Sequence, residues 1–261
     1  MAAPLSHRIN GERVVLLGWG RAILLQLAHP LIAAGVYEHS SFRATPWTAA
    51  ARLHETVHAM LALTFGTERD RRETIERICT IHQRVHGGLS EPVGPFPEGT
   101  PYSAEDPDLV LWVHLTLLES VLLVYSLFVA PLSEAEWDTY CGEAVWVPLA
   151  LGARDHEIPR SSAELRAAIA RVYASRAITV GSQARELAAA VLAPRIGRLV
   201  PPFAAVNRLV TIGLLPEDVR NQYGFPWDAR QQARFERAIP RLRRLRHYLP
   251  DVLALWPHAR R

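Results

Sequence analysis

Apolar residues recur at the spacing of an α-helix along most of the chain, and no segment shows the alternation typical of a convincing β-strand. The segment 107–130 is apolar on every side. Such a helix either spans a membrane or lies at the centre of a bundle. Polar side chains within it, among them His114 and Glu119, favour the bundle, and a buried Glu119 is expected to pair with an arginine or to lie near a polar cavity. The pattern predicts an all-α, multi-helix bundle that is globin-like in class, with a central buried helix near residues 107–130.

Two consecutive helices are predicted between residues 45 and 88. The first has Thr45 as its N-cap and ends at Gly66. The second begins with a capping box at Thr67 and ends at the pair of glycines at 87 and 88. Because the two helices are joined so tightly, we expect them to run antiparallel, side by side.

The second of these helices carries a histidine on its apolar face. His82 follows Ile75, Ile78 and Cys79 at helical spacing and precedes Val85, so it is expected in the middle of the buried face. One interpretation is a core histidine whose ring is satisfied by hydrogen bonds. The other is an axial ligand of a haem iron, because a neutral imidazole in an apolar pocket is suited to that role.

The first helix carries a metal-binding motif at residues 54–58, which read His-Glu-Thr-Val-His and match H-E-x-x-H. In that motif two histidines share one zinc ion and the glutamate, here Glu55, is the general base. Glu73 and Glu76 on the next helix are candidates for a third ligand. A zinc-dependent hydrolase is therefore an alternative, although the strand edge that zinc proteases offer their substrate is not predicted. Residues two apart lie about 200° around a helix, so Arg52 points away from both histidines.

Two further segments interrupt the helical pattern. Residues 13–36 are apolar but contain glycines, Arg21 and the His29-Pro30 pair. These interruptions favour a buried helix pair over a membrane span, with His29 at the corner, because a residue before proline avoids helical geometry. Residues 87–106 are rich in proline and glycine and lack periodicity, which indicates either a lid or binding loop or a plain surface crossing.

The C-terminal segment is basic and amphipathic, and Pro240 is expected to kink or divide it. Opposite arginine and apolar stripes are typical of a solvated helix docked on its own domain, and also of a helix lying on an anionic membrane. A non-enzymatic helical protein that binds a membrane or a partner through this segment is a further alternative. The two stripes are Arg230, Arg234, Arg237, Arg241 and Arg244, and Phe235, Ile239, Leu242, Leu245 and Leu249.

Composition narrows the classes of function. The chain has 261 residues, 49% of them hydrophobic, which is enough for a sizeable core. It contains no lysine, so all 29 basic residues are arginines, and this excludes a P-loop and Schiff-base chemistry. Two cysteines without ligand spacing and the lack of a secretory signal are typical of a cytoplasmic protein. The sequence has no hydrolase nucleophile elbow, dinucleotide fingerprint or nucleic-acid-binding signature.

Several segments, taken in order, resemble a known family. They are QLAHPLIAAGVYEHSSFR, a helix with Arg52 and Thr56 four residues apart, FGT, IHQRVHGG and PYSAEDPDLVLWVHLTLLES. Their order and spacing are similar to those of the latex-clearing-protein and MpaB-type oxygenases over about residues 14–130. We expect one all-helical domain over residues 1–261, in which 131–261 form helical walls and the basic C-terminal helix.

The resemblance implies a cofactor and a reaction. In the rubber-cleaving members a b-type haem is bound by the histidine that matches His82, and the residues that match Arg52 and Thr56 lie close to it. An acidic residue near the position of Glu38 is a proposed base. The reaction is oxidative cleavage of an isoprenoid C=C bond by dioxygen. The resemblance therefore implies His82 as the proximal iron ligand, Arg52 and Thr56 as polar pocket groups, and a hydrophobic, isoprenoid- or polyene-like substrate.

Two positions depart from the family pattern. Glu55 stands where the rubber-cleaving enzymes have a lysine as distal ligand, and a glutamate there would change oxygen binding and proton supply. Glu38 or Glu55 is accordingly the candidate acid/base. His86 stands where other members commonly have an arginine, one turn after His82 on the predicted helix. It is a further cofactor-binding candidate that replaces His82, supplements it or has no part in its role.

Overall fold

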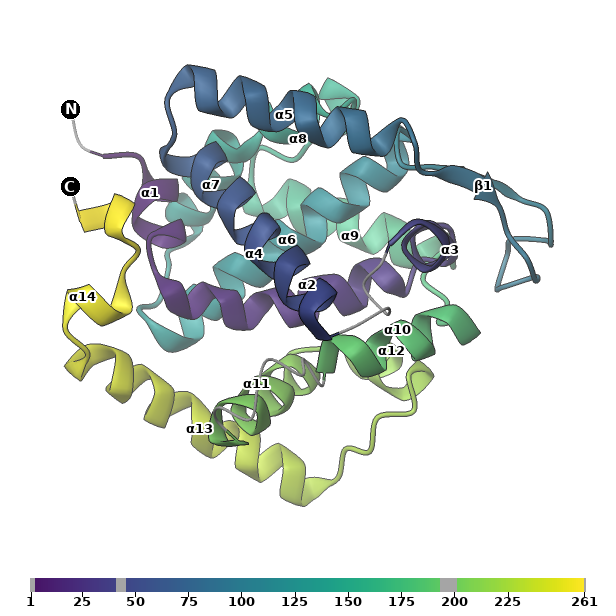
Figure 1. Cartoon of the computed structure of the whole chain (residues 1–261). Coiled ribbons are helices and arrows are strands. Elements are labelled where there is room, and N and C mark those ends of the chain that lie inside the picture. The colour runs from purple at the N-terminus through teal and green to yellow at the C-terminus, as the bar shows by residue number, and fades with distance from the viewer. Residues whose placement is uncertain (1–2, 41–45, 193–200, 261) are drawn as a thin grey trace.

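The computed structural model describes residues 3–40, 46–192 and 201–260, with the backbone alone for 46–53 and 201–203. The fold is all-α, as predicted (Figure 1), and its described residues form one small sheet of two strands, β1 (His86–Gly88) and β2 (Pro101–Ser103). The helices are α1 (Leu5–Asn10), η1 (Arg13–Leu16), α2 (Leu17–Leu27), α3 (Pro30–His39), α4 (Pro46–Phe65), α5 (Glu68–His82), α6 (Pro107–Phe128), α7 (Glu134–Ala144), α8 (Trp146–Ala150), η3 (Asp155–Glu157), α9 (Ser162–Ala174), α10 (Ser182–Leu192), α11 (Pro201–Gly213), α12 (Glu217–Gln222), α13 (Ala229–Tyr248), α14 (Asp251–Ala254) and η4 (Pro257–Arg260).

Helix α6 is the central buried helix that the sequence predicts. It begins after Asp106, whose side chain accepts a hydrogen bond from the backbone N–H of Asp108 at 2.9 Å. Along its length it packs on α2, α7, α9 and α13. Leu115 and Leu122, on the side of α6 that joins the main core, are fully buried. An apolar surface all round this helix is explained by neighbours on several sides.

Polar contacts in the interior hold α2 across α6. The guanidinium of Arg21 donates hydrogen bonds to Glu119 Oε2 at 2.6 Å, to Ser120 Oγ at 2.7 Å and to the carbonyl oxygen of Leu214 at 2.8 Å. The Arg21 side chain is only 5% exposed. A charge buried this deeply is tolerated only when its hydrogen-bonding capacity is met. The predicted pairing of Glu119 with an arginine is confirmed.

The chain turns sharply between α2 and α3. His29 has extended backbone angles, φ −87° and ψ 117°, immediately before Pro30, which confirms the predicted corner. The segment 13–27 and α3 are bent by 104° relative to each other. By length and composition α6 would suffice to cross a membrane, as would this bent pair taken as one span. Of the most apolar window of α6, 67% is buried inside the fold.

Helices α4 and α5 form a hairpin that opens away from its turn. Helix α4 ends at Phe65, as predicted, whereas its predicted cap, Thr45, lies outside the described residues. The capping box that begins α5 is confirmed, because Thr67 Oγ1 accepts from the N–H of Asp70 and the Asp70 carboxylate accepts from the N–H of Thr67. The two helices diverge from this turn (Figure 1), so the expected side-by-side packing holds only near it.

Helix α5 is shorter than predicted, because it ends at His82 and not at the glycine pair. The residues 86–88 form β1, which pairs antiparallel with β2 in the register His86 with Ser103 and Gly87 with Tyr102. A Cβ atom on Gly87 would lie 2.6 Å from the hydroxyl oxygen of Tyr102, so glycine permits this close approach. The prediction that His86 lies one turn after His82 on the same helix was therefore wrong.

The connection between α5 and α6 is not structureless, and the prediction that the chain has no strand was wrong here. Beyond β1 and β2 the two segments stay together, because Val93 and Phe96 form an isolated antiparallel bridge around a turn. Gly94 in this turn has φ +57°, and a Cβ there would meet Thr179 Oγ1 at 2.5 Å. The proline- and glycine-rich segment is thus a long β-hairpin. Its proposed role as a lid stays a prediction.

Two of the later helices begin at side chains that cap them. Ser133 forms a capping box at α7, and the Ser161 side chain caps α9. The residues between Ser133 and Leu151 form two helices, α7 and α8. Helix α13 continues through Pro240, so this residue does not divide the C-terminal segment. Both Pro240 and Glu236 are exposed, and water therefore has access where the helix loses one hydrogen bond.

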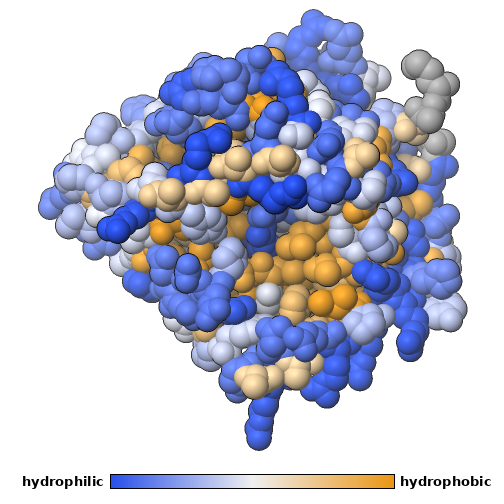
Figure 2. Space-filling model, turned by 180° about the vertical axis from the view of Figure 1, so that it is seen from behind, coloured by the Kyte–Doolittle hydropathy of each residue, from blue (hydrophilic) through white to orange (hydrophobic). Residues whose placement is uncertain are grey.

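Among the described residues, the core consists of three groups of buried apolar side chains. The largest surrounds α2, α6 and α10, and the second joins α6 to α11 and α13. Apolar residues also reach the surface, since Figure 2 shows a hollow on the face opposite to that of Figure 1, with an apolar floor between hydrophilic residues. The third group lies between α3, the β-hairpin and the start of α6, and comprises Leu31, Ala34, Leu89, Tyr102 and Leu109.

Candidate functional site

The apolar face of α5 is covered only in part by the rest of the fold. Thr74 is the one fully buried residue in this helix. Ile75, Ile78, Cys79 and His82, which share the predicted apolar stripe, are all half-buried. Among the described residues of α4, from 54 to 65, none is fully buried. The two helices therefore turn toward the fold with apolar side chains that the protein leaves partly accessible.

His82 is the last residue of α5 and is half-buried, so its predicted place in the middle of a buried face was wrong. Desolvation lowers the pKa of its imidazole, and the negative charge of Glu105 opposes this shift only in part. No described residue forms a hydrogen bond with the ring. His82 thus presents a neutral imidazole whose nitrogens are not engaged by the described side chains. The interpretation as a core histidine satisfied by hydrogen bonds finds no support in these residues.

The residues of the zinc motif lie on the exposed part of α4. His54, Glu55, Thr56 and His58 are all exposed, and the rings of His54 and His58 lie 6.2 Å apart between centroids. Within the described part of the chain, no three histidine, cysteine, aspartate or glutamate side chains gather closely enough to hold a metal ion. Of the candidate third ligands, Glu73 is instead paired with Arg69 at 2.7 Å.

Of the residues that the resemblance brings together, Arg52 and Thr56 lie on α4 and His82 lies on α5, the two helices of the open hairpin. Arg52 lies within α4, but its side chain is outside the described residues. Thr56 is exposed and lies near the middle of α4. Their common pocket with His82 stays a prediction.

Glu38 belongs to a polar cluster at the end of α3. The hydroxyl of Tyr102, on β2, donates a short hydrogen bond to Glu38 Oε2. His39 Nε2 lies 3.4 Å from the same hydroxyl oxygen and 3.1 Å from the carbonyl oxygen of His86. Burial, followed by the hydrogen bond to Glu38 and its negative charge, raises the pKa of Tyr102, which therefore stays protonated and acts as the donor.

This cluster lies beside the end of α5. A Cβ atom on Gly35 of α3 would lie 3.2 Å from Val85 Cγ1, three residues after His82, and 3.5 Å from the ring of Tyr102. Glu38, three residues after Gly35, and His82 thus come from segments that touch. Both acid/base candidates are exposed, and Glu38 is held by a hydrogen bond from the hydroxyl of Tyr102.

Sequence reasoning missed the parts that Tyr102 and His39 take in this cluster. Both residues stand in segments of the family resemblance, but neither has a spacing that points to a partner. The contact depends on the register of β1 and β2, which no periodicity predicts. His86 contributes its carbonyl oxygen here, while its side chain is exposed.

Two histidines with a buried ring nitrogen lie elsewhere in the fold, the buried His29 and the half-buried His114. His114 Nε2 on α6 and His29 Nδ1 at the corner between α2 and α3 have no hydrogen-bond partner among the described residues. Burial lowers the pKa of each imidazole to about 4. Both rings are therefore neutral at physiological pH and belong to the interior, not to the polar cluster of Glu38.

The fold and these side chains define an all-α protein whose candidate site is built by helix ends and a β-hairpin. Over residues 7–244 the sequence matches the family described as "ER-bound oxygenase mpaB/B'/Rubber oxygenase, catalytic domain". The chain belongs to this family, and the resemblance seen in the sequence is confirmed. The match extends well beyond residues 14–130 and includes most of the helices that were expected to form only walls. No curated protein and no solved structure matches the chain.

Proposed function

We propose that the chain is a haem b-dependent oxygenase that acts on a hydrophobic, isoprenoid- or polyene-like substrate. The proposed reaction adds both atoms of dioxygen across one C=C bond and breaks it, which leaves two carbonyl groups. Membership of an oxygenase family supports the class of enzyme. The residues at the candidate site support the haem and the class of substrate.

The neutral imidazole of His82 is the observation that carries the proposal. Its lowered pKa leaves a nitrogen lone pair available at neutral pH, and no described residue uses the ring in a hydrogen bond. The same face of α5 presents Ile75, Ile78 and Cys79, each half-buried. An imidazole beside partly accessible apolar side chains is the donor set that a haem requires, so the residues fit the cofactor.

Each proposed residue has one task. His82 would hold the iron, which when bound would supply the activation of dioxygen. Arg52 and Thr56, on the facing helix, would bind a propionate or orient the oxygen through hydrogen bonds. Glu38 would accept or return a proton at its carboxylate, because the hydrogen bond from Tyr102 fixes the orientation of that group. Tyr102 is accordingly a positioning residue.

A hydrophobic substrate suits the composition of this hairpin. Helix α4 presents Val57, Met60 and Leu61 half-buried, and α5 adds its own apolar stripe. Apolar side chains that are partly accessible gain from contact with an apolar ligand, because that contact removes their surface from water. The exposed Glu55 stands where the family's rubber-cleaving enzymes have a lysine, so we propose that the distal side has no protein ligand.

Visible absorption spectra test the proposal. Protein produced with ample haem and iron is compared with His82→Ala and with His58→Ala, each reduced and then exposed to carbon monoxide. We expect a Soret band that shifts with carbon monoxide in the parent and in His58→Ala, and no such band in His82→Ala. His58 is a matched control because it is an exposed histidine of the same hairpin.

Elemental analysis of the same samples separates the haem site from the zinc alternative. Iron bound in proportion to haem, with no zinc, supports the proposal. A colourless parent that holds one zinc ion, lost in His58→Ala, would overturn it in favour of the H-E-x-x-H hydrolase. Substrate class is then tested with a polyene and isotopically labelled dioxygen, for which we expect one labelled oxygen atom in each of two carbonyl products.

A further inference from the structure

The outward face of α13 carries a line of arginines. Its members follow one another at three or four residues, so they share one side of the helix, and every one is exposed. No described residue forms an ion pair with any of them. Like charges at this spacing repel, which makes the line unfavourable in isolation. We call this set the arginine stripe, and it consists of Arg230, Arg234, Arg237, Arg241 and Arg244.

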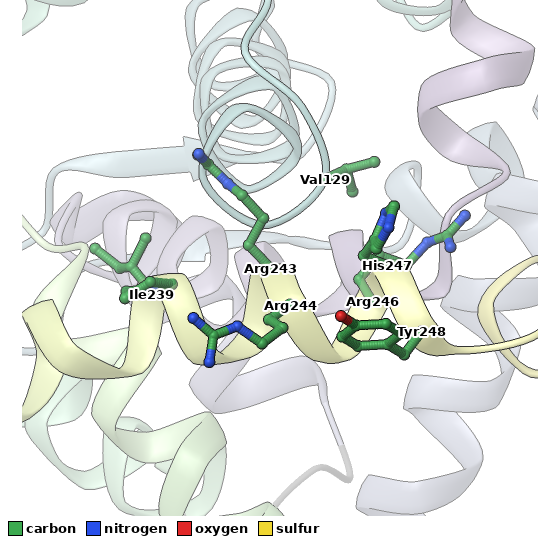
Figure 3. Close-up of a pocket in the computed structure, with 8 residues that line it drawn as sticks. Val129, Ile239, Arg243, Arg244, Arg246, His247 and Tyr248 are labelled. Atoms are coloured by element: carbon green, nitrogen blue, oxygen red, sulfur yellow. The ribbon is translucent and has the colours of Figure 1, made fainter.

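Other arginines of the same helix are used to fix it to the fold. Arg243 donates to the carbonyl oxygens of Ser126 and Leu127, each at 2.9 Å, and so caps the end of α6. Arg246 forms a bidentate pair with Glu12 at 2.6 and 2.7 Å. Figure 3 shows Arg243 directed toward the neighbouring elements and Arg244 on another side of α13. The stripe is thus free of the contacts that hold the helix in place.

Exposed apolar side chains follow at the C-terminal end of the stripe. Leu245 is 56% exposed, Tyr248 75%, Val252 56% and Leu253 57%. These are four of the six large hydrophobic side chains that are exposed among the described residues, and they fall within nine consecutive positions. Their concentration distinguishes this end from the scattered apolar residues that any protein surface carries.

A groove adjoins the same end of α13. It has a volume of about 600 Å³ and is lined by Val129, Ile239, Arg244, His247 and Tyr248, together with neighbouring residues of the helix. Figure 3 shows His247 and Val129 beside each other at this groove and Tyr248 on the outward side. The groove belongs to α13 and the end of α6, so it is separate from the candidate site at His82.

We propose that α13 and α14 form a docking surface for an anionic lipid bilayer. The stripe supplies a row of cations for lipid phosphates and carboxylates, and the apolar end supplies side chains that insert at the headgroup boundary. A nucleic acid would use the arginines but not Val252 or Leu253. Charge complementarity therefore selects an anionic partner, and the exposed aliphatic side chains select a bilayer. This surface acts independently of the proposed reaction.

Vesicle co-sedimentation of the full chain tests the proposal. The probes are vesicles of pure phosphatidylcholine and vesicles with about 30 mol % phosphatidylserine. We expect binding to the anionic vesicles only, weakened by salt. The variant Arg237→Gln/Arg241→Gln/Arg244→Gln should bind about a hundredfold more weakly, because each arginine near an anionic surface contributes about a fivefold factor. The variant Val252→Ser/Leu253→Ser should also bind the vesicles less well.

The control is Arg72→Gln/Arg77→Gln/Arg171→Gln, which removes three exposed arginines elsewhere and changes the net charge by the same amount. It should bind like the parent, and circular dichroism should show all variants folded. Equal losses in the control and the stripe variant would overturn the proposal, because net charge alone would then explain binding. A parent that binds heparin, a soluble polyanion, but binds no vesicle would also overturn the proposal. So would a Val252→Ser/Leu253→Ser variant whose binding to heparin and binding to vesicles fall equally.

Discussion

The region around α2 and α6 and the hairpin of α4 and α5 are packed very differently. In the first, Leu115 and Leu122 are fully buried, and Arg21 has three partners in the interior. In the second, no described residue of α4 and only Thr74 of α5 is fully buried. Composition accounts for part of the difference, because α6 is apolar on every side whereas α5 has one apolar stripe among charged residues.

The contacts that hold the hairpin lie near its turn. Asn10 donates to Thr64 Oγ1 at 3.2 Å, and the Phe65 ring lies 5.0 Å from that of His7. Arg71, one turn into α5, lies over the ring of Trp146 at 5.7 Å. His82 is at the opposite end of α5. One region therefore provides stability, and the other carries apolar side chains and an imidazole that the protein does not use for itself. That division is typical of a ligand site set on a rigid scaffold.

The largest expected effect comes from breaking the interior ion pair. Replacing Arg21 by methionine should lower the free energy of unfolding by about 4 kcal/mol, because Glu119 then loses the partner of its charge in a largely buried place. Urea unfolding measures this. The matched change Arg69→Met removes an exposed pair within α5, and its unfolding midpoint should stay that of the parent. Equal losses of unfolding free energy in the two variants would show that the two regions do not differ in their contribution to stability.

Cavity-forming substitutions sharpen the same comparison. Leu115→Ala, at a fully buried position of α6, should cost about 3 kcal/mol, since the transfer term and the cavity term add. Ile78→Ala, at a half-buried position of α5, should cost less than half as much without haem. Thermal unfolding of both variants gives the order. A larger loss at Ile78 would show that α5 is as tightly packed as α6.

The histidine of α6 predicts a dependence on pH. Its folded pKa of about 4 lies below the ordinary 6.5, so between these values the unfolded chain binds more protons. The stabilisation is complete above pH 6.5 and is lost as the pH falls toward 4, by roughly 3 kcal/mol for this residue. His114→Leu should flatten that part of the stability profile. His156→Leu, which removes an exposed histidine, should leave the slope as it is.

The smallest effect concerns the polar cluster. Tyr102→Phe removes the hydroxyl that donates to Glu38 and should cost about 1 kcal/mol of stability. A double-mutant cycle with Glu38→Gln measures the coupling of the two side chains. A coupling energy indistinguishable from zero would mean that Tyr102 does not hold Glu38, and its role as a positioning residue would fall.

Local sequence signals predicted the ends of helices well where a capping residue or a proline determines the end without help from distant residues. The capping box at Thr67, the corner at His29 and the start of α6 all depend on neighbouring residues. The end of α5 was mispredicted because helical spacing continues to Val85, whereas pairing of residues 86–88 with β2 ends the helix at His82. A cross-strand register depends on residues far along the chain, so periodicity does not contain it.

The sequence predicted which residues belong to the candidate site better than it predicted how they are arranged. Burial supports His82 as a neutral imidazole, and Glu38 has a partner that its own segment does not reveal. The divergence of α4 from α5 could not be predicted from the sequence, because a tight turn fixes the direction of two helices only near the turn. The pairing of Arg21 with Glu119 was predictable, since a buried carboxylate requires a cation and the neighbouring apolar helix contains one.

Hydrogen exchange with and without haem tests whether the hairpin of α4 and α5 is the haem site. If haem binds His82 and covers the apolar faces of the hairpin, backbone amides of residues 54–65 and 68–82 should exchange more slowly when it is present. Amides of α2 and α6 should change little, and His82→Ala should abolish the added protection. Haem that leaves α4 and α5 unchanged, or that protects them equally in His82→Ala, would contradict the account.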